Sequence, residues 1–406
     1  MLTEWIRSHP PSRPFLISGE GTLTYGDLLA AGAPDGPGQH VVVPDGTLES
    51  VVRLMTSPGN GRQLVLIDPS CPVEEKRRRR EVAASAAGQA AATILFTSGT
   101  TGPAKAVRLT AGNWEAAARA SAAHLNHTPD DVWLAAMPLH HVGGLSILYR
   151  SAFVGAAVRW LPRFEVTAVA EAMRGDVTIV SVVPTMLRRL LDHDDGLYRD
   201  LKAVLVGGGP IPPGLLEEAH SRGIPALPTY GMTETCAQVA TLRPGSRPRY
   251  AAHPLPGIDV RVVGERIHLR GAQISPGYVG EADRSPEDWF VTPDRGVLDE
   301  DGALRLLGRV DRVVVTGGEN VDPGRVESIL ASHPGVEAAA LVGVPDPEWG
   351  ERLVGVYVGA AEPASLRAWA AERLAPYEVP RDLRRVEEMP LAGGGKPDLD
   401  AVRALF

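Results

Sequence analysis

The feature that most constrains the fold is an alternation of short apolar runs with helical stretches along the first half of the chain. Each run has the length of a buried strand, and the stretches between runs carry Ala, Arg and Glu at helical spacing. Strands that alternate with helices favour parallel α/β layers. The expected strands are 63–67, 92–96, 132–136, 177–183 and 201–206, and the expected helices include 74–87, 113–125 and 168–173.

Two later changes in the sequence predict a second domain. β-rich segments separated by turns follow residue 258, and the run 308–312 precedes a new series of short strands and helices. A helix is expected to begin at Asp322-Pro323, because Asp suits the N-cap and Pro suits the first turn. Since 406 residues exceed one ordinary core, we expect a large N-terminal α/β domain of layered sheets and helices over 1–308. A small α+β domain should follow over 309–406.

The composition indicates an enzyme or a small-molecule binding protein. Hydrophobic residues make up 44% of the chain and charged residues 22%, and the net charge of −8 argues against a nucleic-acid polymer as partner. No apolar stretch approaches the roughly 18 residues of a membrane span, and residues 1–14 lack the apolar run of a signal peptide. Cys71 and Cys236 form neither a disulfide framework nor a zinc site. We therefore expect a cytoplasmic protein, with homo-oligomerisation left open.

Lysine is rare enough to be informative. Of 41 basic residues only four are lysines, namely Lys76, Lys105, Lys202 and Lys396. Where Lys persists against such a bias, a compact ammonium is favoured, because the planar fork of Arg cannot replace it. The basic run 76–80 is flanked by glutamates, which is typical of a solvated helix face.

The segment from Thr97 to Lys105 has the composition of an anion-binding loop. Hydroxyl and glycine positions occupy 97–102, and they offer side-chain donors and accessible backbone N–H groups, to which Lys105 adds positive charge. The loop is not a Walker A motif, since no Gly-Lys-Ser/Thr sequence ends it. The alternative is a polar strand-to-helix turn without a ligand.

This loop resembles the phosphate-binding signature of the acyl- and aryl-CoA synthetases, which belong to the adenylate-forming superfamily. Further segments resemble that family's motifs in the same order, at 138–144, 207–210, 230–235, 289–294, 308–320 and 395–396. The resemblance implies a large N-terminal adenylate-forming domain and a small mobile C-terminal domain that carries the catalytic lysine. It also implies ATP, Mg²⁺ and CoA as cofactors or co-substrates.

The resemblance assigns roles to individual residues. Those expected to hold ATP are Thr97, Ser98, Gly99, Thr100, Thr101, Gly102, Lys105, Gly207, Gly208, Gly209, Tyr230, Gly231, Met232, Thr233, Asp294, Arg309 and Lys396. Glu234 is the expected Mg²⁺ ligand, because carboxylate oxygens suit this hard cation beside phosphates. The acid is expected at His141, Gly231 and Gln238, and catalytic roles at Lys396, His141 and Thr97. Asp311 is the expected hinge, and Gly317 and Gly318 are expected to border the CoA channel.

Each of the principal assignments has a structural alternative. Lys396 could be a surface lysine, Glu234 a favourable charge at a helix N-terminus, and Tyr230 a core residue. Asp294 and Arg309 could be surface turn residues. His141 could be a satisfied core histidine, or His140 beside it could be the structural one.

Within the superfamily, 231–238 resembles the o-succinylbenzoate–CoA ligases of menaquinone biosynthesis, although Ala237 stands where Ser is expected. The implied reaction activates a carboxylic acid as an acyl-adenylate and transfers it to CoA, releasing pyrophosphate and AMP. Three alternatives remain open: a ligase for another aromatic or short acyl acid, a ligase that loads a carrier protein, and a non-catalytic nucleotide-binding protein.

Overall fold

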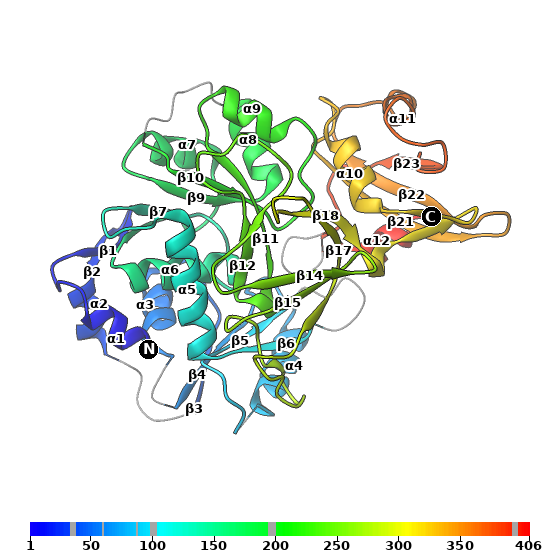
Figure 1. Cartoon of the computed structure of the whole chain (residues 1–406). Helices are drawn as coiled ribbons and strands as arrows, with labels where there is room; N and C mark the ends of the chain where they lie inside the picture. Colours follow the sequence, from blue (N-terminus) through cyan, green and yellow to red (C-terminus); the bar gives the residue numbers. More distant parts are fainter. Residues whose placement is uncertain (33–37, 59–60, 87, 98–103, 194–199, 392–396) are drawn as a thin grey trace.

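The computed structural model describes residues 1–32, 38–58, 61–86, 88–97, 104–193, 200–391 and 397–406. Figure 1 shows a large N-terminal part built of layered sheets and helices, with a smaller C-terminal part (orange to red) beside it. The predicted fold class, α/β with one large and one small domain, is thereby confirmed. The proposed boundary between residues 308 and 309 stays a prediction.

A nine-stranded sheet lies at the centre of the large domain, in the order β13-β12-β11-β10-β9-β7-β8-β1-β2. Its strands are β1 (Pro14–Ser18), β2 (Gly21–Thr24), β7 (Val132–Ala135), β8 (Ala157–Trp160), β9 (Ile179–Val182), β10 (Ala203–Val206), β11 (Ala226–Met232), β12 (Ala237–Thr241) and β13 (His253–Pro254). The strands from β1 to β11 pair in parallel, and β2, β12 and β13 add antiparallel edges. The strands predicted at 132–136, 177–183 and 201–206 are confirmed.

A five-stranded sheet carries the predicted phosphate loop, in the order β16-β6-β5-β4-β3. Its strands are β3 (Gly38–Val42), β4 (Arg62–Leu66), β5 (Thr93–Phe96), β6 (Ala106–Leu109) and β16 (Gly277–Tyr278). The strands predicted at 63–67 and 92–96 are confirmed. Because β5 and β6 are antiparallel neighbours, the loop joins two strands. The loop is therefore not a strand-to-helix turn.

Helices cover both sheets of the large domain. They are α1 (Leu2–Arg7), α2 (Tyr25–Ala31), α3 (Leu48–Thr56), α4 (Val73–Ala84), α5 (Ala111–Leu125), α6 (Val142–Val154), α7 (Val166–Arg174), α8 (Pro184–His193) and α9 (Leu215–Ser221). A capping box begins α5, where Asn113 N donates to Thr110 Oγ1 at 3.1 Å and Thr110 N donates to Asn113 Oδ1 at 2.8 Å. None of the helices described is long and apolar enough to cross a membrane.

One apolar core joins the two sheets and fixes their relative position. It includes Leu66 and Leu95 from the five-stranded sheet, Trp133 from the nine-stranded sheet, and Trp114 from α5. The burial of these apolar side chains is the main stabilising contribution to such a domain. The loops that follow β4, β5 and β7 therefore lie at a defined junction between the two sheets.

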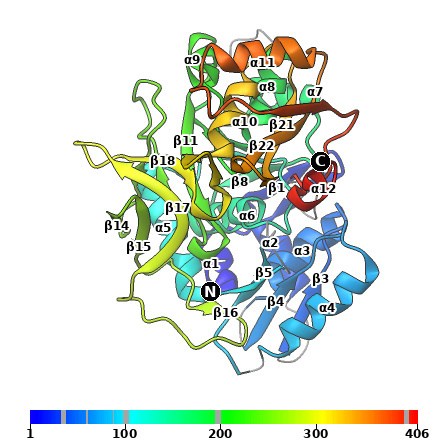
Figure 2. The same cartoon turned by 90° about the vertical axis from the view of Figure 1, so that its right-hand side faces the viewer.

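A third sheet leads from the large domain to the small one. Its strands, in the order β14-β15-β17-β18, are β14 (Asp259–Val263), β15 (Arg266–Arg270), β17 (Phe290–Leu298) and β18 (Leu304–Arg309). Figure 2 shows this sheet on the side opposite to α4 and the five-stranded sheet. β18 runs directly into a short 3₁₀ turn (Val310–Arg312), which is the start of the predicted hinge.

The small domain has its own sheet and its own core. It contains β19 (Val314–Thr316), β20 (Glu319–Val321), β21 (Ala338–Asp346), β22 (Gly350–Val358), β23 (Asp382–Arg385), α10 (Pro323–Ala331), α11 (Pro363–Ala371) and α12 (Leu399–Arg403). Its core includes Val326, Leu353 and Leu366. The predicted start of α10 is confirmed, because the Asp322 side chain accepts a hydrogen bond from Gly324 N at 3.0 Å.

The prediction of a solvated face for 76–80 is wrong for Arg79. Its side chain is buried, with Nε 2.7 Å from Glu75 Oε1 and its guanidinium 5.2 Å from the centre of the Phe96 ring. The neighbouring Arg77 pairs with Glu74 and Glu81 at the surface, as predicted. The pattern of charges in the sequence could not distinguish the buried Arg79 from the exposed Arg77, because that depends on which face of α4 packs against the sheet.

Candidate active site

The base of the phosphate loop is closed by contacts between its two ends. Thr97 N donates to the Lys105 carbonyl oxygen at 2.9 Å, and Lys105 N donates to Thr97 Oγ1 at 3.3 Å. The structure thus brings Thr97 and Lys105 together, as expected for a loop that folds around an anion. Ser98, Gly99, Thr100, Thr101 and Gly102 lie outside the described residues, as does Lys396.

Lys105 and Glu234 both contact one aromatic residue, Tyr278, which the sequence did not single out. Lys105 Nζ lies 4.8 Å from the centre of the Tyr278 ring, within the range of a cation–π interaction. The Tyr278 hydroxyl donates to Glu234 Oε1 at 2.8 Å. The expected phosphate-binding lysine and the expected metal ligand are therefore neighbours. Nothing in the linear sequence pairs Tyr278 with Glu234, which lies 44 residues away.

The chemistry of this side chain set is compatible with Mg²⁺. Among the described ranges, no group of three or more His, Cys, Asp or Glu residues could hold a metal alone. Mg²⁺ commonly binds through one or two carboxylates together with phosphate oxygens and water. Glu234 supplies one carboxylate, and Tyr278 bonds only one of its two oxygens. The site therefore fits a Mg²⁺ ion whose remaining ligands come from nucleotide phosphates and water.

A second polar cluster connects the residues expected at the adenosine. The Tyr230 hydroxyl donates to Asp294 Oδ2 at 2.7 Å, and Arg309 Nη1 lies 3.9 Å from Asp294 Oδ1. Burial raises the pKa of Asp294, while the Tyr230 hydrogen bond and the Arg309 charge oppose that shift. Arg309 also forms a two-point ion pair with Asp311, at 2.8 and 2.5 Å. The predicted ribose and hinge residues thus form one connected chain of contacts.

The glycines of the 207–209 and 231 segments allow backbones to approach closely. A Cβ on Gly207 would stand 2.6 Å from the Thr229 oxygen, and one on Gly231 only 1.9 Å from the Ala237 oxygen. Gly208 adopts a left-handed φ of +79°, while Gly209 continues the same turn. Gly207 and Gly231 therefore require glycine for the close packing of the chain around β11 and β12. Met232 ends β11, and Thr233 begins the 3₁₀ turn (Thr233–Thr235) that carries Glu234.

His141 and Thr97 line one small cavity of about 10 Å³, together with Leu66, Asp68, Arg79, Phe96 and His140. His141 stands at the N-cap of α6, and its ring centre lies 4.3 Å from that of His140. Burial lowers the pKa of His140, and the Asp68 carboxylate, 3.5 Å from its Nε2, partly opposes this. The sequence prediction put His141 beside the acid pocket and did not include Asp68 or Arg79.

Gln238 lies in the interior, with both ends of its amide paired. Its Oε1 accepts from Ser121 Oγ at 3.0 Å, and its Nε2 donates to Thr241 Oγ1. These contacts do not bring Gln238 into the cavity that His141 lines. Gly317 and Gly318 form the two-residue turn between β19 and β20, with φ values of +60° and +84° that favour glycine in such a hairpin. The turn explains these glycines without reference to a channel.

The polar residues thus form two clusters. We call the one around Lys105 and Glu234 the phosphate side and the one around Tyr230 and Asp294 the adenosine side, after the ligand parts predicted there. The chain matches the AMP-binding enzyme family over residues 40–281 and the AMP-binding enzyme C-terminal domain over residues 325–396. Because the first match covers more than half of the chain, the protein belongs to the AMP-binding enzymes of the adenylate-forming superfamily.

Two similar relatives carry the same name, 2-succinylbenzoate–CoA ligase. The 2-succinylbenzoate–CoA ligase of Geobacillus kaustophilus is 41% identical over an alignment of 323 residues, and the match covers 74% of this chain and 66% of that protein. The ligase of the same name from Bacillus subtilis is 35% identical over an alignment of 326 residues, and the match covers 75% of this chain and 67% of that protein. The match thus spans about two thirds of the length of these relatives.

Solved structures resemble the chain over almost its whole length. The o-succinylbenzoate CoA synthetase of Bacillus subtilis in complex with the acyl-adenylate OSB-AMP has a TM-score of 0.88 at 28% identity, covering 98% of this chain and 97% of that one. Its complex with ATP and a magnesium ion also scores 0.88, at 28% identity, and covers 99% and 98%. A double mutant of that synthetase, bound to the product analogue OSB-NCoA, scores 0.72 at 28% identity over 99% and 98%.

Proposed function

We propose that this protein is an ATP- and Mg²⁺-dependent ligase that converts a carboxylic acid into an acyl-adenylate and then into a thioester of CoA. The observation that carries the proposal is that Lys105, at the end of the phosphate loop, and Glu234 both contact Tyr278. A separate cluster around Asp294 offers acceptors for sugar hydroxyls. Family membership supports the same reaction class.

Adenylation solves a chemical problem that the acid alone cannot. A carboxylate resists nucleophiles because it is negatively charged and its oxygen is a poor leaving group. When its oxygen attacks the α-phosphorus of ATP, pyrophosphate leaves and the acyl group acquires AMP as a good leaving group. Two anions must meet in this step, so the protein's contribution is positioning and charge stabilisation.

The nucleotide roles follow from the two polar clusters. Lys105 and the loop N–H groups would hold the phosphates, and Glu234 would hold Mg²⁺, which draws charge from phosphate oxygens when bound. Asp294 would accept hydrogen bonds from the ribose hydroxyls, Arg309 would donate to them, and Tyr230 would lie against the adenine. Lys396 would bridge the substrate carboxylate and the α-phosphate as a compact cation.

The acid that we favour is o-succinylbenzoate. The named relatives and the structure bound to OSB-AMP support this choice, as does the resemblance of 231–238. His141 would border the acid, since it lines the cavity beside Thr97. Gly231 stays a predicted acid contact, and the Ala237 backbone fills the space beside its Cα. Gln238 remains a predicted contact, although its paired amide favours a structural role.

Thioester formation would require the small domain to turn about Asp311. The CoA sulfur would attack the acyl carbon from the space that Lys396 would occupy during adenylation. In this step the thiol proton is lost and AMP leaves. The lower TM-score against the product-analogue complex, 0.72 against 0.88, is what a different domain arrangement would produce.

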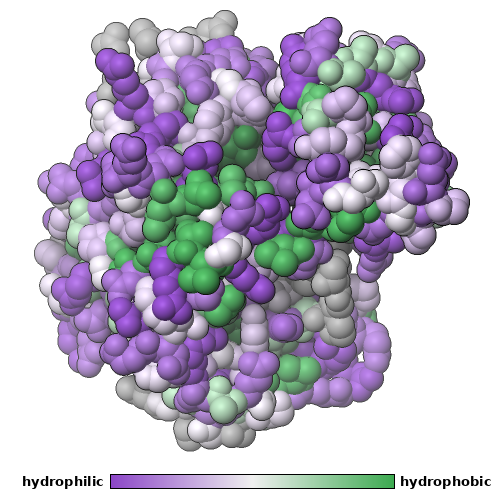
Figure 3. All heavy atoms as spheres, turned by 45° about the vertical axis from the view of Figure 1, so that its right-hand side comes forward, coloured by the Kyte–Doolittle hydropathy of each residue, from purple (hydrophilic) through white to green (hydrophobic). Residues whose placement is uncertain are grey.

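Figure 3 shows apolar side chains gathered on an exposed face. Leu306, Val310 and Val315, near the proposed hinge, are also exposed. Such side chains suit a surface that a rotated domain covers.

The rotation is tested by measuring adenylate formation and thioester formation separately in the Lys396→Ala variant. We expect loss of adenylate formation and retention of thioester formation from a supplied acyl-adenylate. The control is Lys202→Ala, because Lys202 pairs with Asp131 where β10 and β7 begin, at the end of these strands opposite to the loops that follow them. Equal loss of both half-reactions in Lys396→Ala would exclude the alternation.

The reaction class and the acid are tested together by a substrate panel. Pyrophosphate release is measured with aromatic and short acyl acids, including o-succinylbenzoate, and the thioester is then assayed with CoA or with a carrier protein. We expect release that depends on o-succinylbenzoate and a thioester with free CoA. A preference for another acid would favour the related ligase, and ATP binding with no acid-dependent AMP would favour a non-catalytic binding protein.

A further inference from the structure

Tyr278 contacts both charged groups of the phosphate side, although each comes from a different segment. Lys105 precedes β6, Glu234 lies in the turn after β11, and Tyr278 ends β16. The ring lies beneath the Lys105 ammonium, and the hydroxyl bonds the Glu234 carboxylate. The same segment also holds the main chain of Glu234, because Ser275 N donates to the Glu234 carbonyl oxygen at 2.8 Å.

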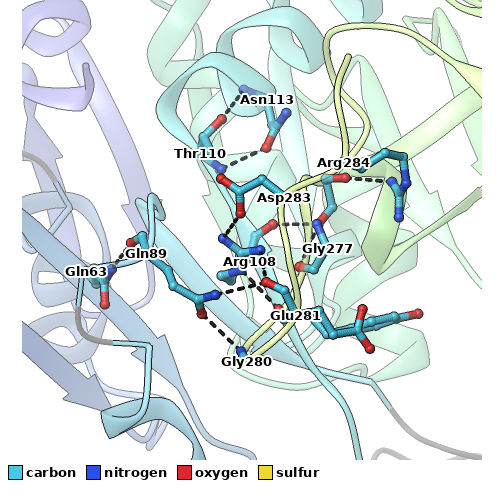
Figure 4. Close-up of polar contacts among 12 residues, drawn as sticks. Gln63, Gln89, Arg108, Thr110, Asn113, Gly277, Gly280, Glu281, Asp283 and Arg284 are labelled. Carbon is cyan, nitrogen blue, oxygen red and sulfur yellow. Dashed lines mark hydrogen bonds and ion pairs between the residues drawn. The ribbon is translucent and has the colours of Figure 1, made fainter. Parts of the chain in front are cut away.

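The backbone of Tyr278 is itself held by a buried arginine. Arg108 is fully buried in β6, and its Nε donates to the Tyr278 carbonyl oxygen at 3.1 Å. Its Nη2 donates to the Glu281 carbonyl oxygen at 3.3 Å, and its Nη1 lies 2.7 Å from Asp283 Oδ1. Figure 4 shows Arg108 at the centre of these contacts. A burial this complete is expected only where the charge is paired and its donors are used.

A second residue fastens the same loop from the other side. Gln89 Nε2 donates to the Glu281 carbonyl oxygen at 3.0 Å, and its Oε1 accepts from Gly280 N at 3.1 Å. Gln63 Nε2 in turn donates to the Gln89 carbonyl oxygen at 2.8 Å. The segment from Gly277 to Asp283 is therefore bound through Arg108 and Gln89 to the five-stranded sheet and the chain that leads into it (Figure 4).

We propose that Tyr278 is a positioning residue that sets the Glu234 carboxylate for Mg²⁺ and the Lys105 ammonium for the phosphates. Its hydroxyl bonds Glu234 Oε1 and so leaves the second carboxylate oxygen for the metal. This assignment rests on the proposed function of the site. Its ring stabilises the ammonium without neutralising it, so that the charge stays available to phosphate. Partners that hold a ligating carboxylate typically contribute a factor of about 10 to 100 in metal affinity.

Two substitutions separate the two contacts. Tyr278→Phe removes the hydroxyl and keeps the ring, whereas Tyr278→Leu removes both. Binding of ATP is measured by calorimetry with Mg²⁺ and with EDTA, without any acid. For Tyr278→Phe we expect Mg·ATP to bind about 10- to 100-fold more weakly while metal-free ATP binds as in the wild type. For Tyr278→Leu we expect metal-free ATP to bind more weakly as well.

The control is Tyr25→Phe, whose hydroxyl donates to the Ala156 carbonyl oxygen at 2.9 Å, between the start of α2 and the start of β8. It should bind both forms of ATP normally. Dissociation constants refer to folded molecules, so lowered thermal stability of a Tyr278 variant does not obscure the comparison. Normal Mg·ATP binding by Tyr278→Phe, or equal weakening with and without metal, would overturn the proposal. If the wild type itself gained no affinity from Mg²⁺, the proposed function would fail instead.

Discussion

Tyr230→Phe should weaken nucleotide binding by a mechanism that can be followed with pH. The change deletes one hydroxyl, which donates to the buried Asp294 carboxylate at 2.7 Å. A hydrogen bond to a charged group contributes about 1.5–3 kcal/mol, so the free energy of unfolding should fall by about that amount. The same bond lowers the pKa of Asp294 against the effect of burial, and its loss should raise that pKa further.

The sign of the pH effect follows from the chemistry of an acid. A carboxyl whose pKa rises is protonated over more of the acidic range, and a protonated Asp294 accepts ribose hydroxyls less well. The acidic limb of ATP affinity should therefore move to higher pH in Tyr230→Phe, with the largest loss of affinity at mildly acidic pH. Calorimetric titrations with ATP across the pH range measure this directly.

The control for lost stability is Tyr25→Phe. Its buried hydroxyl lies 2.9 Å from the Ala156 carbonyl oxygen, far along the chain from the site. This variant should lose stability without moving the pH limb. An unmoved limb in Tyr230→Phe, with stability lost as in the control, would refute the reasoning that Asp294 holds the nucleotide.

Three further outcomes are expected. Glu234→Gln should need a higher Mg²⁺ concentration for half-maximal ATP binding, whereas an unchanged Mg²⁺ titration would contradict its role as ligand. Burial lowers the pKa of His127 to about 4, so about 3 kcal/mol of folding stability should be present above pH 6.5 and lost as pH falls to 4. In denaturation experiments, the free energy of unfolding of His127→Phe should not show this fall between pH 6.5 and 4. Gln238→Met should lower the melting temperature, because Ser121 and Thr241 lose their partner, and leave the KM of the acid unchanged; a raised KM would restore its predicted substrate role.

The sequence predicted the elements whose signal is local. The buried strands β4, β5, β7, β9 and β10 are short and mostly apolar, and the start of α10 follows from Asp322 and Pro323. The phosphate loop was located by its small residues and its rare lysine, and the structure closes it through Thr97 and Lys105. Such patterns depend on neighbours within a few residues, which a single sequence displays.

The contacts that assemble the site were not readable in the same way. Tyr278 lies far from both Lys105 and Glu234 in the chain, and only the packing of β16 against β6 brings the three together. Arg79 belongs to a charged run whose other members are solvated, so its burial depends on which turn of α4 faces the sheet. Gln238 sits within a motif, yet its amide is used inside the core. Each case is decided by tertiary packing rather than by local pattern.

The most direct test of the central claim is acid-dependent exchange of labelled pyrophosphate into ATP, measured in the absence of CoA. Exchange requires reversible formation of an acyl-adenylate, so it isolates the step assigned to Lys105, Glu234 and Asp294. We predict exchange that needs both Mg²⁺ and o-succinylbenzoate and that falls sharply in Glu234→Gln. Absence of exchange with every acid tested, in protein that binds ATP, would contradict the account.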